Sequence, residues 1–182
     1  MKLSYFFGLL LLLSIKNEII YLMVQYKNGD RVIHCRDGLA VVVNHTLIGE
    51  KEYYVVKTIR GGGENIYVPF DRAEIIIRPI MSKKEADELI EYMKGIEVEY
   101  NSNTKQRRDS LKRRLSSGDV KDIAHLFKQL YFFKTSIDHS IRYGPVDLDM
   151  LNYANNNLLD EFAISYDIDR DAIEEFVYKK LS

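Results

Sequence analysis

The sequence predicts an α+β protein in which a small, bent antiparallel β-sheet or open barrel precedes a bundle of α-helices. Up to about Arg78, short β-branched and aromatic runs alternate with turn residues, which is typical of β-strands. After Pro79, the apolar residues recur with the spacing of helices. The 182 residues leave room for two small domains, so we expect one domain for each pattern.

Five runs in the first half are expected to form strands: 31–35, 39–45, 52–58, 65–68 and 74–77. Turn residues separate them, including Asp37-Gly38 and the three glycines 61–63. Short strands joined by tight turns form a strongly bent sheet or a small open barrel. Such a sheet keeps at least one unpaired edge, and an unpaired edge is a template for a strand from a partner.

The second half predicts four or five helices. Ser82 and Glu85 have the spacing of a capping box, which predicts a first helix that ends near Gly95. A second helix is expected around 105–115, and a third begins after the capping residue Asp119. A fourth follows Gly144-Pro145, and a last one follows Asp169.

An apolar leader precedes these domains. Its apolar stretch, 5–13, resembles a secretory signal, but it is shorter than the roughly 20 residues of a membrane-spanning helix. No small-x-small cleavage pattern follows it. We expect Met23 to be the true initiator; a real signal or anchor and an added structural helix remain the alternatives. The expected domains are therefore a leader (1–23), a β domain (24–80) and a helical domain (81–182).

The composition favours a globular cytoplasmic protein. Hydrophobic residues make up 46% and charged residues 29% of the chain. Cys35 is the only cysteine, which excludes an intramolecular disulfide and is typical of the reducing cytosol. The net charge of -1 gives no general attraction to nucleic acid, so any such attraction depends on local clusters of charge.

The densest cluster of charge is the run 105–114, in which six of ten residues are basic and one is acidic. On a helix, Lys105, Arg108 and Lys112 follow one row, and Arg107 and Arg114 follow another nearby. Leu111 and Leu115 would form the apolar seam that holds this helix to its bundle. The run predicts a surface for the phosphates of duplex DNA, with weak and largely non-specific binding. The alternative is an ordinary solvated helix face.

Nothing in the sequence indicates an enzyme, a cofactor or a small-molecule substrate. The four histidines lack the spacing of a metal site, and the glycines 61–63 lack the Lys-Ser/Thr of a phosphate loop. Cys35 lies in a strand pattern and is expected to be structural. Asp147, Asp149 and Asp160 fall on a predicted helix and are expected to be solvated.

Several blocks, in order, carry a family resemblance: Tyr26-Lys27-x-Gly29-Asp30-x-Val32-Ile33, Gly49 to Lys57 with its Tyr-Tyr pair, Val68-Pro69, Ile77 to Ile80, Lys105-Gln106-Arg107, and Ser117-Gly118-Asp119 with Leu130-Tyr131. In series these blocks resemble the CarD/CdnL family of bacterial transcription regulators. The similarity spans about Gln25 to the C-terminus and thins after Lys134.

The resemblance implies a Tudor-like β domain that binds the β subunit of RNA polymerase, with no membrane partner. In similar proteins the strand before Val-Pro contacts the polymerase by strand pairing, and a position equivalent to His45 is also used. The polymerase-binding residues implied here are His45, Asn65, Ile66, Tyr67, Val68 and Pro69. Because alternation buries one face of this strand, Tyr67 is the best candidate for the partner side.

The helical half departs from the family pattern. Thr104 stands where relatives carry a Trp that wedges into the minor groove, and the chain has no Trp at all. Phe132 and Phe133 replace the usual basic residues after the Leu-Tyr pair. The implied contacts to promoter DNA are Thr104, Lys105, Arg107, Arg108, Lys112 and Arg114. Polymerase docking is thus better supported than DNA contact. The alternatives are an interaction module that has lost DNA contact, and an enzyme or membrane-anchored factor.

Overall fold

A computed structural model of the chain describes residues 14–15, 18–19, 26–60 and 62–181. Most of the predicted leader lies outside the described residues. Within it, β1 (Ser14–Ile15) and β2 (Glu18–Ile19) pair as a short antiparallel ladder.

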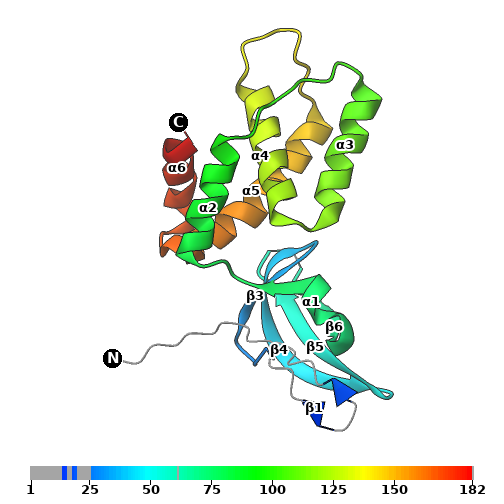
Figure 1. Cartoon of the computed structure of the whole chain (residues 1–182). Helices are drawn as coiled ribbons and strands as arrows, with labels where there is room; N and C mark the ends of the chain where they lie inside the picture. The colour runs from blue at the N-terminus through cyan, green and yellow to red at the C-terminus, as the bar shows by residue number, and fades with distance from the viewer. Residues whose placement is uncertain (1–13, 16–17, 20–25, 61, 182) are drawn as a thin grey trace.

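The first half forms an antiparallel five-stranded sheet in the order β6-β5-β4-β3-β7. This arrangement, followed by helices, confirms the predicted α+β fold (Figure 1). Strand β4 is longer at both ends than the predicted run 39–45. The strands are β3 (Arg31–His34), β4 (Gly38–Ile48), β5 (Lys51–Thr58), β6 (Asn65–Pro69) and β7 (Ile77–Pro79).

 Relative to the predicted runs, β6 gains Pro69, and β7 keeps only Ile77 of the run 74–77.

The last predicted strand is wrong over most of its length. Residues 74–76 belong to a short helix, α1 (Ala73–Ile76), which follows the 3-10 turn η1 (Phe70–Arg72). Ala73 and Ile77 are buried, whereas Ile75 is 75% exposed. An apolar run of this length fits one helical turn as well as a strand, so periodicity alone cannot separate the two.

The β domain packs its core on one face of the sheet. A bulge between Val42 and Asn44 shifts the register of β4 against β5, and such bulges bend a strand. The buried core consists of Tyr26, Val32, Ala40, Val42, Tyr54, Val56, Val68, Ala73 and Ile77.

The second half forms the predicted helical bundle: α2 (Lys83–Lys94), α3 (Thr104–Ser117), α4 (Val120–Thr135), α5 (Pro145–Tyr166) and α6 (Arg170–Leu181). The capping box of α2 is confirmed. The Glu85 amide donates to Ser82 Oγ at 3.3 Å, and the Ser82 amide donates to the Glu85 carboxylate at 2.7 Å. The Asp119 side chain caps α4 as expected.

Helix α5 is the central helix of the bundle, because it packs against α2, α3, α4 and α6 and also contacts β4 (Figure 1). Two of its acidic residues were expected to be solvated and are instead buried: Asp147 is 2% and Asp160 is 7% exposed. Asp149 is exposed, as expected. Within the described residues, no helix combines the length and the apolar character that a membrane crossing requires.

Candidate functional site

Strand β6 is one edge of the sheet. Among the described strands it pairs with β5 alone, with Tyr54 opposite Val68 and Val55 opposite Tyr67. The main chain on the other side of β6 therefore has no neighbouring strand within the described residues. An edge of this kind can accept a strand from another chain.

The side chains of β6 alternate between the two faces of the sheet. Val68 is fully buried and Ile66 is half-buried against the β-domain core. Asn65 is exposed, and Tyr67 is 50% exposed on the opposite face. Of the residues predicted from the sequence, Tyr67 and Asn65 are therefore open to a partner, whereas Ile66 and Val68 mainly hold the strand to its own core.

A shallow hollow lies on the outer face of the sheet beside Tyr67. It is lined by residues of β4, β5 and β6: Val43, Asn44, Thr46, Val55, Lys57, Asn65 and Tyr67. A strand added at β6 would direct alternate side chains toward this face, because side chains in a strand point alternately up and down.

His45 lies on the other face of the sheet from Tyr67. It is opposite Tyr54 in the β4–β5 ladder, and Tyr54 is opposite Val68. The exposed His45 ring meets Tyr54 edge-on at 4.9 Å and Phe70 edge-on at 5.6 Å. The structure thus places Tyr67 on the edge strand and His45 two strands further in, on opposite faces of the sheet.

Helix α3 carries the basic run. The Asn103 side chain accepts from the Gln106 amide at its start, and Gly118 ends it in the left-handed conformation. Leu111 is buried and Leu115 is half-buried against the core, which confirms the predicted seam. Thr104 is exposed at the first position of the helix.

The basic residues of α3 fall into two groups. Lys105, Arg108 and Lys112 are exposed along one row, and no ion pair involving them is found among the described residues. The second row faces inward beside Leu111. There, Arg114 is 30% exposed and donates to the Asp122 carboxylate at 2.9 Å.

Arg107 does not lie on the cationic surface that was predicted for it. It is 4% exposed, and it donates to the Asn101 carbonyl at 2.9 Å and to the Tyr100 hydroxyl at 3.3 Å. Its guanidinium also lies 5.0 Å from the centre of the Tyr100 ring. The Tyr100 hydroxyl in turn accepts from the Arg142 amide at 2.8 Å. Arg107 therefore organises the entry to α3, and its guanidinium is not free to contact a phosphate.

A second region of interest lies where the two domains meet. A small pocket there is lined by residues of both domains, among them His34, Cys35, Arg78, Tyr153 and Glu161. Burial lowers the pKa of His34, and this effect outweighs the Asp37 carboxylate 2.7 Å away, which raises it. Among the described residues, no group of histidine, cysteine and carboxylate side chains could hold a metal ion.

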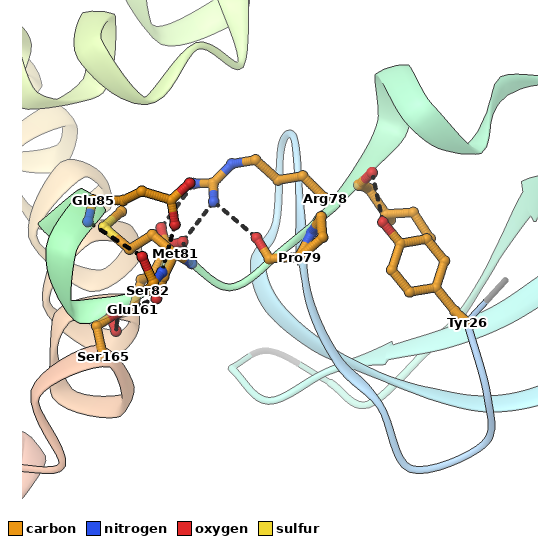
Figure 2. Close-up of polar contacts among 9 residues, drawn as sticks. Tyr26, Arg78, Pro79, Met81, Ser82, Glu85, Glu161 and Ser165 are labelled. Carbon is orange, nitrogen blue, oxygen red and sulfur yellow. Dashed lines mark hydrogen bonds and ion pairs between the residues drawn. The ribbon is translucent and has the colours of Figure 1, made fainter. Parts of the chain in front are cut away.

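The sequence reasoning missed four charged residues of this domain junction: Arg60, Arg78, Asp160 and Glu161. Arg78 forms two hydrogen bonds to Glu161, at 2.5 and 2.7 Å (Figure 2). Arg60 forms two to Asp160, at 2.5 and 2.8 Å. The available signal was a pair of adjacent carboxylates inside the apolar stretch 158–163.

Comparison with protein-family models gives one match for each half of the chain. The model described as the CarD-like/TRCF RID domain matches residues 26–81. The model described as the CarD C-terminal domain matches residues 88–178. The first match covers the whole five-stranded sheet, and the second covers α3, α4 and α5 in full.

Proposed function

Because the chain belongs to the CarD family of RNA polymerase-interacting transcription factors, we propose that it docks on the polymerase β subunit through strand β6 and contacts promoter DNA through the exposed cations of α3. The observation that carries the proposal is the unpaired outer edge of β6. Main-chain pairing along such an edge supplies affinity, and the side chains beside it supply specificity.

Tyr67 is the proposed anchor of this interface. It combines a half-exposed aromatic ring with a place beside the hollow on the outer face. Aromatic anchors of protein interfaces are often worth about 2 kcal/mol or more, which corresponds to a loss in affinity of more than about tenfold.

Calorimetric titration of the polymerase β subunit with the full chain tests the docking. Tyr67→Glu is expected to weaken binding at least about tenfold, because a carboxylate would be placed against the partner strand. Tyr92→Glu is the matched control, since Tyr92 is a partly exposed tyrosine of the helical domain (38% exposed). Equal affinity for both variants, with unchanged circular dichroism, would remove Tyr67 from the interface.

The proposed DNA contact is electrostatic and weak. It rests on Lys105, Arg108 and Lys112, which share an exposed row of α3. Each phosphate contact contributes about -0.9 to the slope of log K against log salt, so three contacts give a slope of about -3. A duplex titrated at several salt concentrations measures this slope.

A second candidate function is polymerase docking without DNA contact. It is favoured by Thr104 at the start of α3, because a threonine lacks the apolar surface of a wedge that holds distorted DNA. Burial of Arg107 and pairing of Arg114 further reduce the free positive charge. Absence of measurable duplex binding even at low salt would select this function.

Thr104→Trp restores the aromatic ring at the start of α3. This variant is expected to prefer a melted DNA junction over plain duplex more strongly than the unchanged chain does.

A further inference from the structure

One stripe of α5 faces the β domain, while another face of the helix lines the bundle core. Tyr153, Asn157, Asp160 and Glu161 lie on this stripe with the spacing of a single helical face. Leu151, Leu158, Leu159 and Phe162 are buried in the helical core. The same helix thus holds the bundle together and carries the surface that meets the sheet.

Glu161 joins three segments at this junction. It is 1% exposed, and its carboxylate accepts both hydrogen bonds from Arg78 of β7. It also accepts from the amide of Met81, in the link between the domains, at 2.9 Å (Figure 2). The Ser165 hydroxyl, one turn further along α5, donates to the Met81 carbonyl at 2.7 Å. The last strand and the link are therefore fixed to α5 together.

Asp160 makes a second connection, to the segment that follows β5. It is 7% exposed and accepts two hydrogen bonds from Arg60, which follows β5, and one from Arg170 of α6 at 2.6 Å. Neighbouring carboxylates on one helix thus hold two arginines, one in β7 and one just after β5. Buried carboxylates need such partners, because an unpaired charge is strongly disfavoured in a protein interior.

Close contacts of two glycines with side chains of the other domain complete the junction. A Cβ atom on Gly38 would lie 2.0 Å from Asn157 Oδ1, and a Cβ atom on Gly118 would lie 3.0 Å from Cys35 Cβ. The Tyr153 hydroxyl donates to the Arg36 carbonyl. The turn before β4 is therefore in contact with both α5 and the turn between α3 and α4.

We propose that these two arginine–carboxylate pairs form a clamp that fixes the angle between the β domain and the helical domain, so that docking of β6 positions α3 over DNA. The inference rests on the proposed function for its consequence, but the clamp itself concerns only this chain. Two weak contacts held in one fixed geometry reinforce each other, whereas a flexible junction lowers the effective concentration of the second contact.

Residual dipolar couplings measured by nuclear magnetic resonance test the clamp in the full chain. The unchanged chain is expected to show one alignment tensor for both domains. The double variant Arg60→Gln, Arg78→Gln is expected to show a separate tensor for each domain. Arg142→Gln, Arg113→Gln is the matched control, since both arginines are exposed and neither side chain takes part in the hydrogen bonds of the junction. A single tensor in the clamp variant, with its fold intact, would overturn the proposal.

A reversible covalent lock distinguishes a lost clamp from a damaged fold. Gly118→Cys places a thiol beside Cys35, although the 3.0 Å separation of the Cβ atoms is below the usual range of about 3.5–4.5 Å, so the turn must yield slightly. In the clamp variant, oxidation is expected to restore the single tensor, and a reductant is expected to abolish it again. Gly118→Ser carries the same left-handed backbone strain without a thiol. If the double glutamine variant does not fold, the alignment tensors of Arg60→Gln alone are measured in the same way. This single variant is expected to fold, because the Arg60 side chain is 47% exposed.

The functional consequence is measured on a polymerase–promoter complex. The clamp variant is expected to keep its separate affinities for the β subunit and for duplex within about twofold. Its affinity for the assembled complex is expected to fall about tenfold or more and to recover on oxidation of the Gly118→Cys form. A clamp variant with two tensors and unchanged affinity for the complex would overturn the positioning role. An unchanged chain that shows one tensor but no affinity for the β subunit would contradict the proposed function and leave the clamp in place.

Discussion

Arg107 and Arg108 are adjacent in the sequence but have opposite environments. Arg107 is buried against Tyr100, whereas Arg108 is exposed on the cationic row. The sequence contained a signal for this difference, because Arg107 precedes the buried Leu111 by four positions and so shares its helix face. Charge density along the run predicted a basic surface, but it could not show which guanidinium turns inward.

The two arginines therefore have different expected phenotypes. Arg107→Ala should lower the free energy of unfolding by about 1–3 kcal/mol, because it removes buried hydrogen bonds and packing. Arg108→Ala should leave stability within about 0.5 kcal/mol and flatten the salt slope of duplex binding by about 0.9. Denaturant titrations and salt-dependent DNA titrations measure the two effects. Lys179→Ala, an exposed cation of α6, is the control that should change neither quantity.

His34 predicts a pH dependence of stability. Burial holds its pKa below the ordinary value of about 6.5, so the unfolded chain binds this proton more readily than the folded chain does. Stability should therefore fall as the pH drops from about 6.5 toward the lowered folded pKa, and this loss should level off below it. The pKa of His125 is lowered in the same direction, mainly by burial.

Urea denaturation at pH 7.5 and 5.5, each chosen to lie about one unit from the ordinary pKa, checks this dependence. His34→Gln should reduce the difference in stability between the two conditions. His139→Gln is the control, because His139 is exposed and should leave the difference unchanged. A His34→Gln variant with the full pH dependence would assign the effect to other groups.

At the scale of elements, the predictions that the structure confirms rest on short sequence motifs at helix ends. The capping box of α2, the Gly95 stop and the Asp119 cap each depend on a few neighbouring residues, and all are present in the structure. The prediction of a strand over 74–77 was wrong because a few apolar residues fit a helical turn and a strand equally well. Asp160 and Glu161 were missed because their arginine partners are 100 and 83 residues away in the sequence.

The capping box gives a prediction for α2. Ser82→Ala should lower the free energy of unfolding by about 0.5–2 kcal/mol, because the first turn of the helix loses its side-chain acceptor. The Ser82 backbone amide and hydroxyl lower the pKa of Glu85. The stability that the ionised Glu85 carboxylate contributes is therefore present above the ordinary pKa of Glu and is lost as the pH falls through the lowered value. Denaturant titration compares Ser82→Ala with Ser116→Ala, an exposed position of α3 whose replacement should have little effect.

At the scale of the whole molecule, the junction should make the two domains unfold together. Hydrogen exchange followed by nuclear magnetic resonance compares slow amides of the two cores, such as Val42 and Ala154, which are both fully buried. In the unchanged chain their free energies of opening should agree. In Arg60→Gln, Arg78→Gln they should separate, because each domain can then open alone. Equal values in the variant would show that the remaining contacts suffice for cooperative unfolding.

The distance in sequence between the members of each clamp pair also determines when the junction can form. Arg78 and Glu161 are 83 positions apart, and Arg60 and Asp160 are 100 positions apart. Contacts across such separations require closure of long loops and tend to form late. During synthesis the β domain leaves the ribosome first and can fold as a unit, whereas its arginines have no carboxylate partners until α5 has followed. Docking of the domains is therefore expected to be the last step of folding, and the angle between them is set only when the chain is almost complete.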